Sequence, residues 1–235
     1  MIAHSDIPLM AACSGEWQRT GLVVNGTPVA SRAEVRWIQG PTRFVDLRVD
    51  PTGAEPLDGF AGTLRQTGDV FTWHRTIELS ESELPDEGFM SLIDGVLHER
   101  GVHADYSERW ERQPTENDGS GCWAMELTSD ADCAIVVCAS GRLGWAHRID
   151  GVVTIVACEP QAQSDSATDM PSRDRVGSWT ITHASDQSLV GSHLTLGVSP
   201  DGLVTSTVQS AQGTNPRHES TQQWTLAFTE GTIHA

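Results

Sequence analysis

The chain has 235 residues, which is enough for one large all-β domain or two small ones. Its net charge of −17 makes a surface that repels phosphate backbones and anionic lipid, so we expect neither a nucleic-acid partner nor a membrane partner. All 15 basic residues are arginine, which excludes Schiff-base, pyridoxal-phosphate and P-loop chemistry because each of these needs a lysine amine.

The first half of the chain is predicted to fold as a short helix followed by a meander of eight strands. Ser5–Ser14 can form the helix, with Ser5 or Asp6 as its N-cap. The dipeptides Asn25-Gly26 and Asp94-Gly95 are typical of tight hairpin turns. The acidic run Ser80–Glu87 is expected to be a solvated loop. The expected strands are Trp17–Val24, Ala33–Gln39, Arg43–Val49, Phe60–Gln66, Val70–Leu79, Phe89–Ile93, Val96–Gly101 and Ala104–Arg112.

The second half continues the same pattern after a polar break. The segment Pro114–Gly121 contains no hydrophobic residue and is the best candidate for an internal boundary. The segment Glu159–Arg175 is rich in Ser, Asp, Gln and Pro, which predicts a long flexible loop (159–175). The expected strands are Cys122–Leu127, Cys133–Cys138, Leu143–Ile149, Val152–Cys158, Ser178–His183, Ser192–Gly197, Leu203–Ser210 and Gln223–Phe228.

Many short strands with turns every eight to twelve residues indicate an all-β, antiparallel fold. A meander of hairpins favours an up-and-down β-barrel over a Greek-key sandwich. The length leaves open one enlarged barrel or a barrel with a second small sheet. We favour a single barrel domain over residues 1–235 with about ten or more strands.

Period-two alternation indicates which side chains point into this barrel. In the last strand of the meander the face of Asp105, Ser107, Arg109 and Glu111 is wholly polar, so the opposite face should point inward. In the strand Val70–Leu79, alternation places Phe71, Trp73, Arg75, Ile77 and Leu79 on one face. The inward set that we infer from four strands is Trp37, Asp46, Arg48, Trp73, Arg75, Tyr106, Glu108 and Trp110.

Two short motifs resemble a known family of barrels. Gly15-Glu16-Trp17, which opens the first strand, is similar to the Gly-x-Trp signature of lipocalins and the wider calycin group. Asp105-Tyr106 is similar to that group's Thr-Asp-Tyr motif, with Ala104 in place of the threonine. The order of segments from Trp17 to Trp110 also resembles an uncharacterised bacterial family of calycin-like barrels. The resemblance implies that Trp17 plugs the closed end of a barrel that holds a small apolar ligand.

Charged side chains inside a barrel must pair with one another or meet a ligand or water, because an unpaired buried charge costs several kcal/mol, roughly. One interpretation is a structural network of arginines and carboxylates that closes one end of the barrel. The other is a polar floor in an aromatic cavity, where Tyr106 or Glu108 moves a proton and Arg48 or Arg75 holds an anionic or carbonyl oxygen. The candidate catalytic residues are Tyr106, Glu108, Arg48 and Asp46, and the candidate substrate-binding residues are Trp37, Phe44, Trp73, Arg75 and Trp110.

This set suits cofactor-free acid–base chemistry on a small, partly apolar molecule, as in a lyase, isomerase or hydratase. A non-catalytic binding protein with the same cavity is the alternative, and a plugged structural barrel is a third interpretation. A void of several hundred Å³ that contains Tyr106 and Glu108 would favour the first two, whereas a filled interior with fully paired arginines would favour the third.

Metal and cofactor sites are not expected from the motifs. His74, Glu99 and His103 are the nearest approach to a metal-binding set, but no HxH or HExxH spacing occurs and His74 should face out of the barrel. No Gly-rich phosphate loop is present, and haem would need a histidine that points into the cavity. The five cysteines form no CxxC pair, which favours free thiols and a cytoplasmic location.

Overall fold

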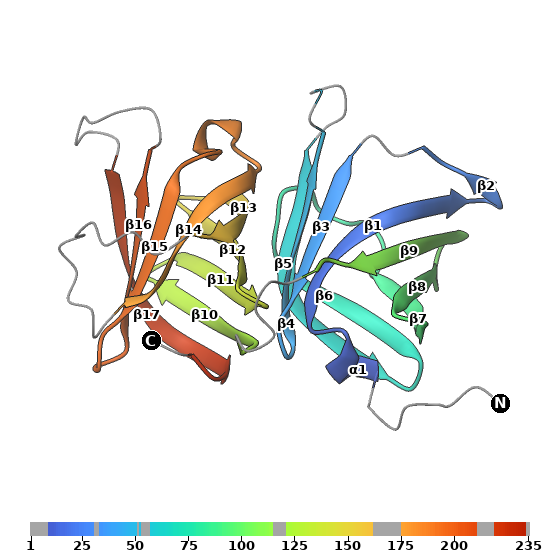
Figure 1. Ribbon diagram of the computed structural model, residues 1–235, viewed down its shortest axis with the longest axis horizontal. Helices are drawn as coiled ribbons and strands as arrows, with labels where there is room; N and C mark the ends of the chain where they lie inside the picture. The colour runs from blue at the N-terminus through green and yellow to red at the C-terminus, as the bar shows by residue number, and fades with distance from the viewer. Residues whose placement is uncertain are drawn as a thin grey trace.

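The computed structural model describes residues 9–30, 33–50, 52, 57–114, 121–161, 175–210 and 219–233. Within these residues the chain forms 17 strands, one short helix and one 3-10 turn, arranged as two antiparallel β-barrels that lie side by side (Figure 1). The helix α1 (Leu9–Ala12) has four residues, and residues 5–8 of the helix expected from the sequence lie outside the described part.

The first barrel is a meander that closes on itself. β1 pairs with β3, and from β3 to β9 each strand pairs with the next along the chain. β1 also pairs with β9 to complete a ring of eight, while the short β2 pairs with β1 outside the ring. Its strands are β1 (Gly15–Val24), β2 (Thr27–Pro28), β3 (Glu34–Gln39), β4 (Arg43–Val49), β5 (Asp58–Thr67), β6 (Val70–Glu78), β7 (Glu87–Ile93), β8 (Val96–Gly101) and β9 (Tyr106–Arg112).

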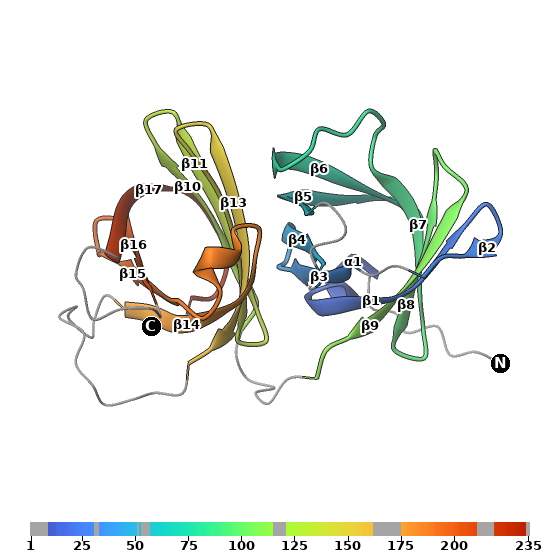
Figure 2. The same cartoon turned by 90° about the horizontal axis from the view of Figure 1, so that it is seen from above.

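The second barrel repeats this arrangement and closes by pairing β10 with β17, and the view from above shows its ring of strands (Figure 2). The 3-10 turn η1 (Gln187–Leu189) follows β14. Its strands are β10 (Trp123–Ser129), β11 (Asp132–Ala139), β12 (Arg142–Ile149), β13 (Val152–Pro160), β14 (Arg175–Ala184), β15 (His193–Val198), β16 (Leu203–Gln209) and β17 (Glu219–Gly231).

The all-β, antiparallel, up-and-down architecture is confirmed, but the strands form two barrels and not one enlarged barrel. An eight-stranded ring has an interior that side chains can just fill, whereas a ring of sixteen strands encloses an aqueous channel. The polar break lies between β9 and β10, and its residues 115–120 are outside the described part, as are residues 162–174 of the loop expected over 159–175.

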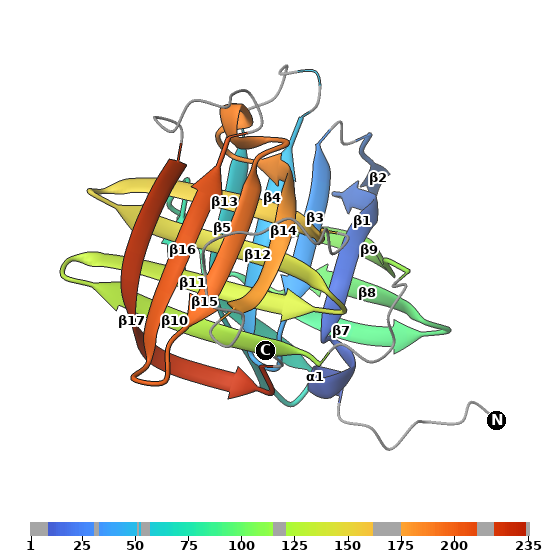
Figure 3. The same ribbon diagram turned by 60° about the vertical axis from the view of Figure 1, so that its left-hand side comes forward.

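The two barrels contact each other through apolar side chains on their outer surfaces. On β4, Val45, Leu47 and Val49 point away from the first barrel's interior and are at most 4% exposed. Figure 3 shows the second barrel lying in front of β3, β4 and β5. Both faces of β4 are therefore covered. The face with Asp46 and Arg48 points into the first barrel, and the face with Val45, Leu47 and Val49 lies between the barrels. The second barrel contributes Ala124, Ile135, Val137, Ala139, Ala146, Ile155 and Ala157.

A β-bulge corrects the face predicted for the end of β6. Ala61 pairs with Ile77 and Gly62 with Arg75, so Thr76 is an extra residue on β6. Ile77 consequently points outward into the contact between the barrels, although strict alternation placed it beside Arg75. Gly62 is required at the bulge, because a Cβ there would lie 1.9 Å from the carbonyl oxygen of His74.

The interiors of the two barrels differ. The second is filled by a continuous apolar core that includes Trp123, Trp145, Trp179 and Trp224. In the first, an apolar cluster fills the end next to α1, where Trp17 is fully buried and its indole Nε1 donates to the carbonyl oxygen of Cys13 at 2.7 Å. This leaves the other end of the first barrel for polar side chains.

A carboxylate from the second barrel also holds the β3–β4 turn of the first. Glu230 Oε1 accepts hydrogen bonds from the backbone N–H groups of Thr42 and Arg43, both at 2.8 Å, and its Oε2 accepts from the Thr42 hydroxyl at 2.6 Å. The Arg43 guanidinium in turn lies 3.7 Å from the centre of the Phe228 ring. The contact between the barrels is therefore polar at this edge and apolar at its centre.

Replacing Glu230 by alanine is expected to lower the free energy of unfolding by about 1–3 kcal/mol, because two backbone N–H groups lose their acceptor. Urea unfolding followed by circular dichroism measures the change. Glu83→Ala, on an exposed loop, is the control and should leave the midpoint unchanged. Equal midpoints for all three proteins would show that Glu230 does not hold the turn.

Candidate functional site

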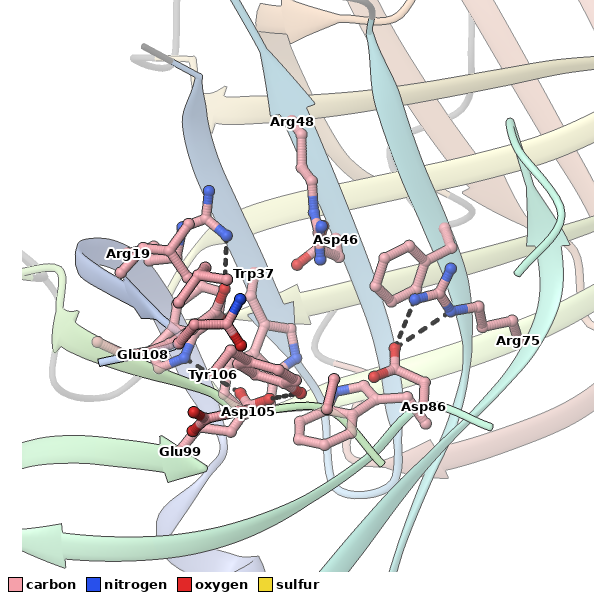
Figure 4. Close-up of a pocket in the computed structure, with 17 residues that line it drawn as sticks. Arg19, Trp37, Asp46, Arg48, Arg75, Asp86, Glu99, Asp105, Tyr106 and Glu108 are labelled. Carbon is pink, nitrogen blue, oxygen red and sulfur yellow. Dashed lines mark hydrogen bonds and ion pairs between the residues drawn. The ribbon is translucent and has the colours of Figure 1, made fainter. Parts of the chain in front are cut away.

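A cavity of about 510 Å³ occupies the polar end of the first barrel (Figure 4). All eight side chains that alternation placed inward line it: Trp37, Asp46, Arg48, Trp73, Arg75, Tyr106, Glu108 and Trp110. Phe44, the ninth predicted site residue, is instead fully buried in the apolar cluster below, where its ring lies 5.8 Å from that of Phe60. Phe60 itself lines the cavity, so Phe44 supports the wall from behind.

Three tryptophans lie in the apolar part of the lining. The Trp37 ring lies 6.0 Å from that of Trp73 and 5.6 Å from that of Trp110, both edge-to-face, and it stacks on Trp17 at 6.2 Å. Trp37 Nε1 donates to Gln39 Oε1 at 3.1 Å. These contacts fix the indoles, so this part of the cavity is preformed.

Each arginine of the cavity lies in an ion pair with a carboxylate. Arg48 Nε lies 2.9 Å from Asp46 Oδ1 on the same strand. Arg19, which the sequence reasoning missed, lies 2.5 Å from Glu108. Its position two residues after the buried Trp17 was the available signal.

Arg75 pairs with a residue from a segment that was expected to be a solvated loop. The Asp86 carboxylate enters the cavity and lies 2.6 Å from the Arg75 guanidinium, and the Asp86 carbonyl oxygen accepts from the Trp73 N–H at 2.9 Å. Asp86 immediately precedes β7, so its position depends on where β7 begins, which an acidic loop sequence does not indicate.

Glu99 is the most deeply buried carboxyl of the cavity after Asp46, at 6% exposed. Its Oε1 accepts from the Tyr106 hydroxyl at 2.8 Å, and its Oε2 accepts from Trp110 Nε1 at 3.2 Å. It faces Glu108 directly across the β8–β9 pair. Gly101 leaves room for the Tyr106 ring, because a Cβ there would lie 2.3 Å from a ring carbon.

Burial and the neighbouring negative charge of Glu108 raise the pKa of Glu99 to about 8. Burial also raises the pKa of Glu108, against the opposing effect of Arg19. Burial and the adjacent Glu99 raise the pKa of the Tyr106 phenol, which therefore keeps its proton and acts as a hydrogen-bond donor. The cavity thus contains a carboxyl that is mostly protonated at neutral pH, beside a phenol.

The sequence places Glu99 only in a possible metal-binding set with His74 and His103. His74 is exposed, and His103 Nε2 lies 2.8 Å from Glu87 Oε2 at the surface. Within the described ranges no three side chains of the metal-ligating types come together, and no histidine lines the cavity. Alternation from Leu97 through Glu99 to Gly101 was the signal that would have placed Glu99 inside.

Comparison with known proteins bears on the fold alone. No protein-family model matches the chain, and no curated protein matches it in sequence. Among the helices described, none has the length and apolar character needed to cross a membrane. The crystal structure of the uncharacterized protein YLR301w from Saccharomyces cerevisiae is similar to this chain, with a TM-score of 0.55 and 12% identity over 92% of this chain and 98% of that one. The chain therefore shares its β-barrel fold with a yeast protein across nearly the full length of both.

Proposed function

We propose that the first barrel binds a small, partly apolar molecule and transfers protons on it, as a lyase, isomerase or hydratase does. One observation carries the proposal: a cavity of about 510 Å³ holds a buried carboxyl, Glu99, that is hydrogen-bonded to Tyr106 and has a pKa of about 8. A proton carrier works best when its pKa lies near the working pH.

Glu99 takes the central role in this proposal. With a pKa of about 8, roughly one molecule in ten carries the ionised form at pH 7, and that form can accept a proton from a C–H or O–H group. Protonated Glu99 can return the proton to another atom of the same molecule. Tyr106 donates to Glu99 and can hold an oxygen of the substrate in its place.

The residues predicted from the sequence keep supporting roles. Glu108 is held by Arg19 and sets the charge that Glu99 experiences, while Asp46 and Arg48 form a pair that can orient a polar group. The apolar part of the substrate contacts the indoles of Trp37, Trp73 and Trp110, and Arg75 lies at the edge of the cavity beside Phe60.

Binding without turnover is the second candidate. Every arginine that lines the cavity (Arg19, Arg48 and Arg75) lies in an ion pair with a carboxylate, so none needs a negatively charged substrate to neutralise its charge. This observation favours a cavity that recognises a ligand without changing it.

In both cases we place the first barrel beside the lipocalin-like, calycin barrels, and we propose a cytoplasmic location because the five cysteines are free thiols.

Hydrogen–deuterium exchange tests the catalytic proposal. We expect the protein in D₂O to speed exchange of C–H hydrogens next to the carbonyl group in members of a panel of aryl ketones and amino ketones, followed by proton NMR. Glu99→Gln should lower this rate by at least about 100-fold. Glu111→Gln is the matched control, because it makes the same substitution on the outer face of β9.

The outcomes separate the two candidates. Exchange at the wild-type rate in Glu99→Gln would remove Glu99 from the mechanism. Compounds that bind in the cavity without exchanging would support the non-catalytic candidate.

A further inference from the structure

The charges in the cavity are unequal. Five carboxyl groups line it, Asp46, Asp86, Glu99, Asp105 and Glu108, and three arginines do so. The arginines pair with Asp46, Asp86 and Glu108. Asp105, which alternation placed on the outer face, is exposed to solvent. Of the buried carboxyl groups that line the cavity in the described part of the chain, Glu99 alone lies in no ion pair, and its partners are a phenol and an indole.

The lining beside Glu99 is aromatic. Tyr106 and Trp110 contact it directly, and Trp37 and Trp73 continue the same wall. Phe60, on the far side, already holds a cation, since the Arg75 guanidinium lies 3.6 Å from the centre of its ring. The faces of aromatic rings attract cations, and a carboxylate next to them adds a full negative charge.

We infer that the ligand of this cavity is an organic cation, whose ammonium group binds at Glu99 between Tyr106 and Trp110 and whose apolar body packs on Trp37 and Trp73. The inference rests on the proposed binding function and names its ligand class. An anion would meet three arginines that are already paired with carboxylates and two further carboxyl groups, Glu99 and Asp105, that are not paired with an arginine. The net charge of −17 also attracts cations to the protein from solution.

Binding of a cation must be coupled to loss of a proton from Glu99. The free protein holds that proton below about pH 8, whereas a bound ammonium group favours the carboxylate. Affinity should therefore rise with pH and level off above pH 8. For a ligand that binds only ionised Glu99, the affinity rises about 50-fold between pH 6 and pH 8.

The test compares three probes of similar size and different charge: benzyltrimethylammonium, benzyl alcohol and phenylmethanesulfonate. Isothermal titration calorimetry at pH 6, 7, 8 and 9 gives their affinities, and two buffers of different ionisation enthalpy give the number of protons released. The quaternary ammonium has no titratable group, so its pH dependence reports the protein. We expect the cation to bind most tightly at pH 8 to 9 and to release close to one proton at pH 7.

Glu99→Gln keeps the size of the side chain and removes its charge, so the affinity for benzyltrimethylammonium at pH 9 should fall at least about tenfold and become independent of pH. Glu111→Gln on the outer face of β9 should behave as the wild type. A thermal melt of each variant confirms that it is folded.

Equal or tighter binding of benzyl alcohol or phenylmethanesulfonate would overturn the inference and leave the cavity as a binding site. An unchanged pH dependence in Glu99→Gln would overturn it as well. If none of the three probes binds at millimolar concentration, the proposed binding function fails together with the inference.

Discussion

Replacing Trp37 by alanine is expected to lower the free energy of unfolding by about 3–5 kcal/mol. Trp37 is 1% exposed and contacts three other indoles, those of Trp17, Trp73 and Trp110. Removing its side chain leaves a void in the middle of this cluster, which cannot collapse because the surrounding strands belong to a closed ring. Chemical unfolding with guanidinium chloride, followed by far-ultraviolet circular dichroism, measures the loss.

Part of this cost comes from a hydrogen bond. Gln39 is fully buried, its amide nitrogen donates to the carbonyl oxygens of Gly40 and Arg43, and its Oε1 accepts from the Trp37 indole. Trp37→Phe removes that donor but keeps most of the volume, so it should cost about 1–3 kcal/mol. If Trp37→Ala and Trp37→Phe cost the same, the packing of the four indoles adds nothing beyond this hydrogen bond. A loss below about 1 kcal/mol for Trp37→Ala would contradict the role given to the cluster.

The interior of the first barrel could be predicted because alternation is a local property of each strand. The outer face of β9 is wholly polar, so Tyr106, Glu108 and Trp110 had to point inward, and they do. The same argument placed Asp46 and Arg48 on the side of β4 opposite Val45 and Leu47. No knowledge of the neighbouring strands was needed for either step.

The second barrel was missed because both faces of several strands are buried. Val45 and Leu47 look like core residues of their own barrel, but they pack against the second barrel from outside. Alternation gives the two faces of a strand and does not say which neighbour covers each. The bulge at Thr76 reverses the faces within β6, and the sequence shows only the Gly62 that permits it.

The sequence pattern of β8 indicates which way Glu99 points but not what lies next to it. Its strand, β8, alternates as clearly as β9, and Leu97, Glu99 and Gly101 point inward. Its importance depends on what lies across the sheet, since its register partner is Glu108 and its hydrogen-bond partner is Tyr106. Burial and the facing carboxylate of Glu108 raise the pKa of Glu99, and the strand register is what brings the two carboxyl groups together.

Stability is expected to fall as the pH rises toward 8, and Glu99 is the main cause. Folded Glu99 keeps its proton up to about pH 8, whereas an unfolded glutamate releases it near pH 4.5. Between these values the folded state binds more protons, so each step upward in pH favours the unfolded chain. Above pH 8 this shift lowers the free energy of unfolding by about 5 kcal/mol in full.

His147 acts in the opposite direction at lower pH. Burial lowers the pKa of this imidazole to about 4, while an unfolded histidine titrates near 6.5. Between pH 4 and 6.5 the unfolded state therefore binds more protons at this residue, and stability rises with pH. The two effects oppose each other below pH 6.5, and the decline caused by Glu99 continues from there to pH 8, where it amounts to about 2 kcal/mol.

Urea unfolding of the wild type and of Glu99→Gln at half-unit steps from pH 5 to pH 9 isolates the contribution of Glu99. The difference between the two curves should grow in favour of Glu99→Gln as the pH rises and level off above pH 8, because glutamine has no proton to release. Any hydrogen bond lost in the variant shifts its whole curve by a constant and leaves the slope unchanged. The control Glu111→Gln, with a side chain that is 45% exposed, should run parallel to the wild type. Parallel curves for the wild type and Glu99→Gln would mean that Glu99 is ionised in the folded protein at neutral pH, and the proton that the proposed chemistry transfers would then have to come from Glu108 or Tyr106.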